Sequence, residues 1–437
     1  MQGKKFMLPL ILALAFTMVF GFQAEAQEVN INILAMRMGS TEYIEEVQDR
    51  FIEKWAEEGV EVDVNWDYME EEDLRPHSVE DAASGVGHYQ IYQLGTQHMP
   101  LMAANDWVVP IEDYFTEDYA ADEFTGAVVE GASYQDTMYG VPIYNEATHL
   151  IYRHDVFEEL DLDPPQTLEE MKEKAAYIDE QRDDMAGVVL RGQRGAGLNH
   201  VSWKQFLDAF GGEWLTDLEP PYEAAFYSEE GLEATEWYAE MIREYAPEGT
   251  QTDHWRDVMS NFMAGEAAMT IDATSIGRRI VTEEASEVIG QTSFELIPEG
   301  PAGRFPWYFS WNMAVSEPGT EDELTREVAT DFLLWATSQD MKLEVMHEAG
   351  VLPARSTTLE MEEVQEFYDD PGMSNWLENT LASMDIEEAN ENPVIVQIPE
   401  WPAIGDTIGI YLEEIFAGTR SVDDGLREAA ETIDRDF

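Results

Sequence analysis

The sequence predicts an α/β protein of two lobes joined by strands. Three observations predict this class: a strand–helix–strand pattern near the N-terminus, a Gly/Pro-marked crossing at 140–142, and a return strand at 294–298 before a Gly/Pro-rich connection. A chain that leaves one lobe and later returns to it builds a two-lobed body with several connecting strands. The 437 residues, of which 44% are hydrophobic, are enough to form a core in each of two or three units.

The first unit begins with the segment 29–33, where apolar and polar residues alternate as in a half-buried strand. A helix is expected next, with a cap at Ser40 or Thr41. Alternation resumes in 60–66, and 89–94 is expected to be a third strand. Strand, helix and strand in this order predict a βαβ unit, whose parallel strands present ligand-binding loops at their carboxyl ends.

Helices are expected to dominate the second lobe. Thr167 and Glu170 have the spacing of a capping box, and 231–245 carries apolar residues at helical intervals. The crossings then define the expected lobes. They are residues 27–142 plus 293–324 for the first lobe, and residues 143–292 plus 325–437 for the second.

The charge of the chain is strongly negative: 24 Lys and Arg face 91 Asp and Glu, which gives −67 with neutral His. Such a field repels phosphate backbones and anionic lipids, so the sequence argues against nucleic-acid and membrane-surface binding. It favours a surface adapted to molar salt, where self-repulsion is screened; the alternative is an acidic protein from an ordinary organism. Acidic runs such as Glu70–Asp73 are interpreted as solvated faces without site chemistry.

The first residues resemble a secretory signal peptide, expected at 1–26. Lys4 and Lys5 precede the apolar run 6–22, and the small-residue site Ala24-Glu25-Ala26 follows. An uncleaved anchor is the alternative, which the polar residues after Ala26 disfavour. The chain has no Cys, which removes disulfides, thiolate metal sites and lipid attachment through Cys. We therefore expect a soluble periplasmic protein.

Signatures of catalysis are scarce. The eight His residues form no HExxH pair or zinc-ligand spacing, and with 91 acids a carboxylate pair carries no information. We therefore expect no enzyme activity, cofactor or metal. Tryptophans stand in expected loops beside Gly or Pro, where they could stack on a sugar or polyol or instead lie in the core. These residues are Trp203, Trp307, Trp311 and Trp401.

Several motifs, in order along almost the whole mature chain, resemble one known family. They are Tyr139–Pro142 (YGVP), Phe262–Met269 (FMAGEAAM), Gly350–Arg355 (GVLPAR) and Ala417–Thr419 (AGT). The family is the extracellular solute-binding proteins of ABC importers, in the sugar and sugar-alcohol branch that includes maltose- and sorbitol-binding proteins. The resemblance implies the type II periplasmic binding protein fold, with the ligand held in a cleft between lobes joined by hinge strands.

The resemblance also implies cleft residues. Glu146 and Asp272 would accept hydrogen bonds from hydroxyls, Arg355 would donate them, and Trp311 and Trp401 would stack. Such a cleft would be rich in acceptors and short of cations, which suits a neutral ligand. The full set of expected ligand-binding residues is Tyr92, Tyr144, Asn145, Glu146, Trp203, Asp272, Trp307, Trp311, Arg355 and Trp401.

The function expected from these observations is the capture of a neutral sugar or sugar alcohol and its delivery to an inner-membrane ABC permease, by a protein that acts as a monomer. Two alternatives stay open. One is a receptor of the same fold for an amino acid, peptide or compatible solute, because fold alone does not fix the ligand. The other is a secreted glycoside hydrolase, which would turn over oligosaccharides.

The net charge generates a prediction about salt. We expect a higher melting midpoint in molar KCl than at about 0.1 M, because the screening length falls from about 10 Å to about 3 Å. Thermal melts at the two salt concentrations measure it. A midpoint that stays constant or falls with salt would exclude salt adaptation.

Overall fold

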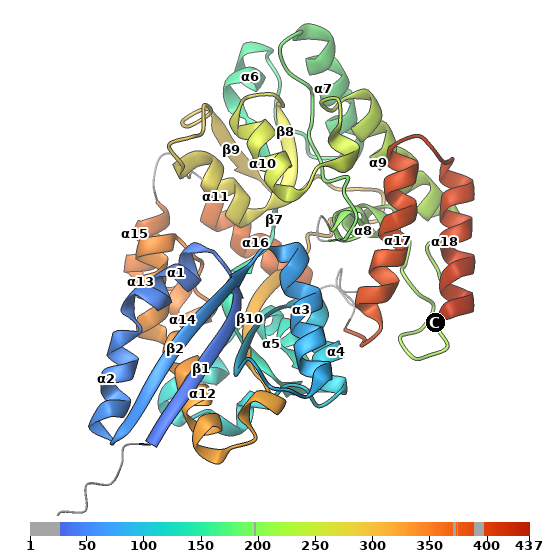
Figure 1. Cartoon of the computed structure of the whole chain (residues 1–437). Coiled ribbons are helices and arrows are strands. Elements are labelled where there is room, and N and C mark those ends of the chain that lie inside the picture. Colours follow the sequence, from blue (N-terminus) through green and yellow to red (C-terminus); the bar gives the residue numbers. More distant parts are fainter. Residues whose placement is uncertain (1–26, 196–197, 370–372, 374, 389–396) are drawn as a thin grey trace, which may run out of the picture.

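The computed structural model describes residues 27–195, 198–369, 373, 375–388 and 397–437. The expected signal peptide, 1–26, lies outside these residues. The chain forms two lobes, each built around a β-sheet flanked by helices (Figure 1). The predicted α/β class with two lobes is confirmed.

The first lobe contains a five-stranded sheet. In spatial order its strands are β2 (Val60–Met69), β1 (Gln27–Met36), β3 (Ile91–Gly95), β10 (Phe309–Val315) and β6 (Gly140–Glu146). β1 runs parallel to β2 and β3, whereas β10 is antiparallel to β3 and β6. In β2 the valines are buried and the acids between them are exposed, because successive side chains point to opposite faces. The predicted parallel βαβ unit is confirmed, although its connection is two helices instead of one.

Helices on and around this sheet complete the first lobe. They are α1 (Gly39–Val47), α2 (Asp49–Glu57), α3 (Glu71–Ser84), α4 (Met99–Ala104), α5 (Gly126–Gly131), α12 (Glu323–Ala336) and α13 (Gln339–Ala349). Two short strands, β4 (Ser133–Tyr134) and β5 (Thr137–Met138), form a hairpin beside α4.

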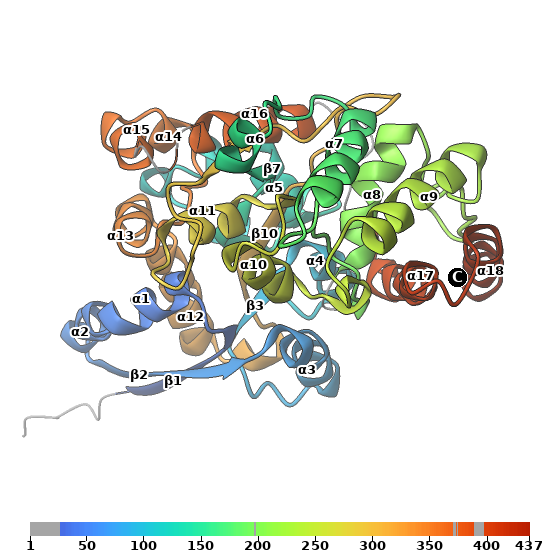
Figure 2. The same ribbon diagram turned by 90° about the horizontal axis from the view of Figure 1, so that it is seen from above.

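The second lobe is built around a three-stranded sheet of β8 (Met269–Ala273), β7 (Thr148–Arg153) and β9 (Thr292–Glu295). Its helices are α6 (His154–Glu159), α7 (Leu168–Gln181), α8 (Asn199–Phe210), α9 (Glu229–Glu244), α10 (Trp255–Met263), α11 (Thr274–Thr282), α16 (Trp376–Glu388), α17 (Trp401–Phe416) and α18 (Val422–Asp436). Helices α14 (Ser356–Leu359) and α15 (Glu362–Tyr368) lie between α13 and α16 in the chain. Figure 2 shows α8, α9, α17 and α18 grouped at one end of the molecule.

Local sequence rules explain where the second lobe's α7 begins. The Thr167 hydroxyl accepts the backbone N–H of Glu170 at 3.2 Å, and the Glu170 carboxylate accepts the N–H of Gln166 at 2.9 Å. The first bond satisfies an N–H group that the first helical turn leaves without a partner, and the second fixes the chain just before the helix. The predicted helix start is therefore confirmed.

The first crossing between the lobes lies further along the chain than expected. β6 and β7 are separated only by Ala147 but belong to different sheets, so the first crossing lies there and not at 142. The return falls in the connection 296–308, between β9 and β10. Gly140–Pro142 begins the crossing strand itself, which is why the Gly/Pro signal appears too early in the sequence.

Helices α12 and α13 contact the first lobe, whereas the sequence placed residues from 325 onward in the second. The Phe332 ring in α12 lies 5.1 Å from Phe51, and the Tyr43 hydroxyl donates to Glu344 in α13 at 2.7 Å. A helical pattern shows that one face is buried but not which sheet buries it. We propose that the first lobe extends through residue 349 and that the third crossing lies between α13 and α16.

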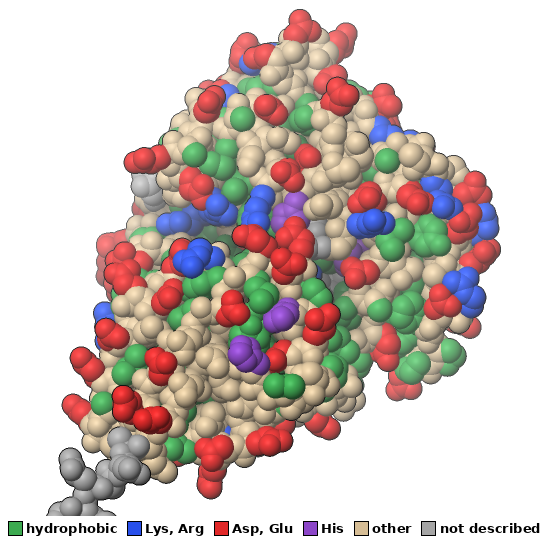
Figure 3. Space-filling view, in the orientation of Figure 1, with side chains coloured by type: hydrophobic (Ala, Val, Ile, Leu, Met, Phe, Trp, Pro, Cys, Tyr) green, Lys and Arg blue, Asp and Glu red, His purple; other side chains and the backbone are tan. Residues whose placement is uncertain are grey.

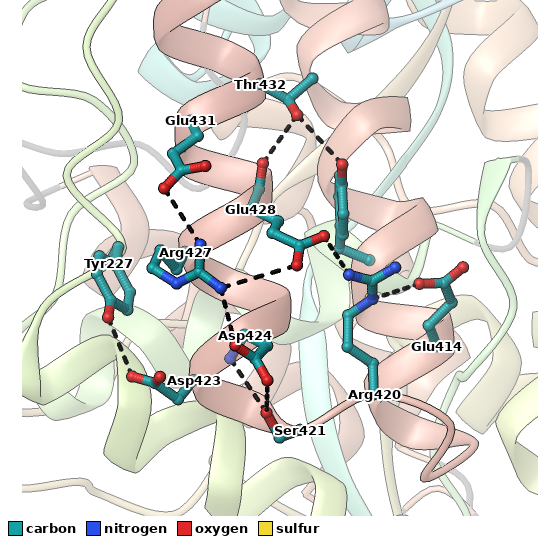
Figure 4. Close-up of polar contacts among 11 residues, drawn as sticks. Tyr227, Glu414, Arg420, Ser421, Asp423, Asp424, Arg427, Glu428, Glu431 and Thr432 are labelled. Atoms are coloured by element: carbon teal, nitrogen blue, oxygen red, sulfur yellow. Dashed lines mark hydrogen bonds and ion pairs between the residues drawn. The ribbon is translucent and has the colours of Figure 1, made fainter.

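Acidic side chains are spread over both lobes on the face drawn in Figure 3. Arginines neutralise some of them, as in the α17–α18 hairpin (Figure 4), where Arg420 pairs with Glu414 of α17 and Glu428 of α18. Arg427 pairs with further acids of α18. Within the described ranges, no helix combines the length and hydropathy needed to cross a membrane.

Candidate functional site

A cavity of about 370 Å³ lies between the lobes. Its first-lobe lining includes Arg37, Met38, Glu71, Tyr144, Glu146, Phe309, Trp311 and Gly350. The second-lobe lining includes Arg191, Val201, Trp255, Arg256, Ser275, Arg278 and Arg279, and the connection back to the first lobe contributes Trp307. Since both lobes supply its walls, a ligand held here would contact both of them at once.

Glu146 is the central acceptor of the site. It ends β6, on the same strand face as Tyr144, and its carboxylate accepts a hydrogen bond from the Ser275 hydroxyl of the opposite lobe. Burial raises the pKa of Glu146 to about 7, against the opposing effects of the Ser275 hydrogen bond and the nearby Arg191 charge. A carboxylate can accept about four hydrogen bonds, so Glu146 keeps capacity for ligand hydroxyls.

Arg191 and Asp272 form a buried bidentate ion pair beside Glu146. Arg191 Nε donates to Asp272 Oδ2 at 2.9 Å, and Nη2 donates to the other carboxylate oxygen. Asp272 does not line the cavity, whereas Arg191 does, with its guanidinium 5.8 Å from the centre of the Trp307 ring. Asp272 therefore orients a cavity arginine and does not itself face the ligand.

Trp307 supplies a hydrogen-bond donor without a partner. Its side chain is 3% exposed, it lines the cavity, and its Nε1 has no hydrogen-bond acceptor among the described residues. A buried polar group without a partner costs free energy, of the order of 1–3 kcal/mol. Trp307 therefore has an unused donor beside the cavity.

Positive charge gathers around the cavity, contrary to the expectation of a cleft short of cations, which is wrong. Five arginines line it: Arg37, Arg191, Arg256, Arg278 and Arg279. Blue side chains accordingly cluster where the lobes meet in Figure 3. Four of the five pair with a carboxylate, whereas Arg278 has no such partner among the described residues and donates to the Ala349 carbonyl at 3.4 Å.

The structure brings four of the ten expected residues together at the cavity: Tyr144, Glu146, Trp307 and Trp311. Asp272 does not line the cavity, but it binds Arg191, which does. Asn145 lies between Tyr144 and Glu146 on β6, and strand alternation turns it to the other face of the sheet. The family resemblance therefore identified the two residues of β6 that line the cavity, Tyr144 and Glu146.

Three expected aromatic residues lie inside the lobes instead. The Tyr92 hydroxyl donates to Asp81 at 2.7 Å within the first lobe. In the second lobe Trp203 donates to Thr235 at 3.0 Å, and Trp401 packs edge-on against Trp214. All three are fully buried away from the cavity lining, so the core alternative holds for Trp203 and Trp401.

Arg355 also has a structural position. It is 1% exposed, and its guanidinium donates to the carbonyls of Ala120, Tyr119 and Thr337 while it lies over the rings of Tyr119 and Phe124. With its donors directed to backbone carbonyls, Arg355 ties the segment after α13 to the first lobe. It does not line the cavity.

Sequence reasoning missed the charged part of the site. Glu71, in a run interpreted as a solvated face, is 4% exposed and lines the cavity, so that interpretation is wrong for this residue. Arg191 follows the short apolar segment 188–190, and Val189 bridges to Thr270 at the edge of the second sheet. That apolar run ending in a charged residue was the available signal.

Comparison with known proteins gives consistent relatives. The family described as bacterial extracellular solute-binding protein matches residues 39–342. The mannitol-binding protein of Pseudomonas aeruginosa is 26% identical over 397 residues, which cover 89% of each chain. A solute-binding protein of Agrobacterium vitis with bound D-mannitol superimposes with a TM-score of 0.80 at 25% identity, covering 93% of this chain and 98% of that one. One of Agrobacterium radiobacter in complex with ribitol gives 0.82 at 20% identity, covering 94% and 100%.

The position of Arg355 generates a stability prediction. Arg355→Lys keeps the charge but loses the planar fork, so we expect the free energy of unfolding to fall by about 2 kcal/mol, because buried carbonyls lose charged donors. Ligand affinity should not change. Urea unfolding and calorimetric titration measure the two quantities, with Arg278→Lys as the matched cavity-lining control. Weaker ligand binding without destabilisation would contradict the structural assignment.

The raised pKa of Glu146 generates a pH prediction. The folded protein keeps this carboxyl protonated up to about pH 7, whereas the unfolded chain ionises near the ordinary value, so the Glu146 contribution lowers stability as pH rises between those values. When the pH is raised from 4.5 to 8.5, the free energy of unfolding of Glu146→Gln should rise, relative to that of wild type, by on the order of 2–3 kcal/mol. Urea unfolding at both pH values, with the exposed Glu57→Gln as control, measures it. Parallel pH profiles for wild type and Glu146→Gln would refute it.

Proposed function

Because this chain belongs to the family of bacterial extracellular solute-binding proteins, we propose that it captures a neutral sugar or sugar alcohol in the periplasm and delivers it to an inner-membrane ABC permease. The observation that carries this proposal is the cavity between the lobes, where an unpartnered indole N–H and a buried carboxylate stand among aromatic walls. The proposal involves binding and release of an unchanged ligand, with no chemical step.

The cavity chemistry suits hydroxyl groups. Trp307 Nε1 can only donate a hydrogen bond, and ionised Glu146 can only accept them. A hydroxyl both donates and accepts, so neighbouring hydroxyls on one ligand satisfy both residues. The aromatic walls, among them Phe309 and Trp311, suit the C–H surface of the same ligand.

The volume of the cavity favours a small ligand. At about 370 Å³ it lies near the lower end of the 300–1,000 Å³ typical of ligand sites. One monosaccharide or one linear sugar alcohol is therefore favoured over an oligosaccharide. The relatives named for mannitol and the structure bound to ribitol support the same size class.

Lobe closure is the proposed working step. A ligand stabilises the closed form only if it contacts that form more favourably than the open one, and walls from both lobes provide this difference. We further propose that residues 1–26 are a secretory signal peptide, that the protein acts as a monomer, and that its acidic surface is adapted to high salt. The signal peptide rests on the sequence pattern of residues 1–26, and the salt adaptation rests on the charge of −67.

A sugar acid is the second candidate ligand. The observation that favours it is Arg278, a cavity-lining guanidinium without a carboxylate partner in the described part of the chain. A ligand carboxylate could receive a bidentate hydrogen bond there. Sugar acids therefore belong in the same screen as neutral polyols.

A thermal-shift screen in molar KCl tests the proposed ligand class. We expect five- or six-carbon polyols or monosaccharides to raise the thermal midpoint, and amino acids and betaines to leave it unchanged. The shift should be measurable, because a ligand at 100 times its Kd adds about 2.7 kcal/mol to stability. Hits confined to sugar acids would select the second candidate. Hits confined to amino acids or betaines would overturn the proposal.

A matched pair of variants tests the site. Trp307→Phe keeps an aromatic ring but removes the cavity N–H, and we expect Kd for the screened ligand to rise about tenfold, in line with loss of one hydrogen bond. Trp401→Phe removes an equally unpartnered indole N–H from the core of the second lobe and should leave Kd unchanged. Equal effects of the two substitutions, measured by calorimetry, would remove Trp307 from the site.

A further inference from the structure

The first turns of two helices from opposite lobes meet beside the cavity. Glu70 and Glu71 begin α3 in the first lobe, and Trp255 and Arg256 begin α10 in the second. Trp255 Nε1 donates to Glu71 Oε2 at 2.9 Å, and Arg256 pairs with Glu70. Acidic, basic and histidine side chains lie together at this junction of the lobes in Figure 3.

A third glutamate and a histidine complete the contact. His254 is the N-cap residue of α10, and its Nε2 lies 3.9 Å from carboxylate oxygens of both Glu71 and Glu72. We call the set Glu70, Glu71, Glu72, His254, Trp255 and Arg256 the α3–α10 contact. It brings three acidic residues of one lobe against two donor side chains of the other, Trp255 and Arg256, with His254 beside them and its Nε2 without a hydrogen-bond partner among the described residues.

Helix electrostatics explain why the acids belong here. The N-terminus of a helix carries a partial positive charge, so two such ends brought together would repel. The glutamates of α3 stand between both ends and are favourable to each. Glu71 also pairs with Arg75 of its own helix, so its nearly buried carboxylate is held from both lobes.

Trp255 faces the cavity but its ring is already covered. The guanidinium carbons of Arg256 and Arg279 lie 4.8 Å and 5.9 Å from the ring centre. A ring covered by cations has less free surface for stacking on a sugar. The indole therefore serves the contact between the lobes, through its N–H to Glu71, more than it serves the ligand.

We propose that the α3–α10 contact is a clasp that holds the lobes closed, so that ligand affinity depends on residues that do not touch the ligand. Glu70 and Glu72 are positioning residues in this sense, since neither lines the cavity. The inference rests on the proposed function, in which the ligand is bound by the closed form. Apparent Kd equals intrinsic Kd divided by the closed fraction, so a tenfold loss of closed population weakens binding tenfold.

The test is a pair of variants. Glu70→Gln/Glu72→Gln removes the two outer carboxylates of the clasp and leaves the cavity lining intact. Asp73→Asn is the matched control, because Asp73 is exposed in the same helical turn. Both variants are compared with wild type in molar KCl, and their thermal midpoints are recorded to detect simple loss of fold stability.

Lobe closure can be measured directly because the chain has no Cys. Glu53→Cys in α2 and Glu173→Cys in α7 place one dye on an exposed site of each lobe for single-molecule energy transfer. Without ligand, the closed population of the clasp variant should fall about threefold, since exposed ion pairs contribute little, and that of Asp73→Asn should match wild type. Identical distributions for all three proteins would overturn the clasp, as would a lower midpoint with unchanged closure.

Addition of D-mannitol separates the clasp from the proposed function. Wild type should close, and the clasp variant should need about threefold more D-mannitol for the same closed fraction, with faster dissociation. Equal D-mannitol requirements would overturn the clasp. If D-mannitol leaves wild type unchanged, that ligand assignment fails, and the ligand-free distributions still decide the clasp on their own.

Discussion

The placement of scarce positive charge is the constraint on which this molecule depends. With 24 basic residues against 91 acidic ones, most of the surface repels itself. Five arginines nevertheless line the cavity between the lobes. Counter-charge favours the approach of two acid-rich lobes, and two of these arginines reach across: Arg256 pairs with Glu70, and Arg278 donates to the Ala349 carbonyl. Ligand site and lobe contact are therefore one electrostatic feature.

Within the cavity, pairing decides what each charge can do. Asp272 takes the planar fork of Arg191, which leaves Glu146 close to that cation without a bidentate partner of its own. Burial then favours the neutral form of Glu146, and its pKa rises. A group balanced in this way can donate or accept a hydrogen bond as its protonation changes.

The periodicity of the sequence predicted the features that local interactions determine. The parallel β1–β2 unit and the Thr167 cap follow from spacing, whereas Tyr144 and Glu146 were expected from the family resemblance. Tertiary packing decided the rest. Trp401 stands beside Pro and Gly signals but is enclosed by Trp214, and Arg355 ends a family-like motif but binds backbone carbonyls. No local pattern distinguishes a tryptophan or arginine that faces a ligand from one that faces the core.

Salt screens the exposed charges of the surface more strongly than the buried charges near the cavity. Screening at molar salt reaches exposed carboxylates and removes their mutual repulsion, whereas buried pairs feel it much less. The Arg191–Asp272 pair within the second lobe is nearly enclosed, the Trp255–Glu71 hydrogen bond is partly buried, and the Arg256–Glu70 pair is exposed. High salt therefore weakens the repulsion between exposed carboxylates more than it weakens the buried pairs. A chain of this charge is best able to close in the same solvent that stabilises its fold.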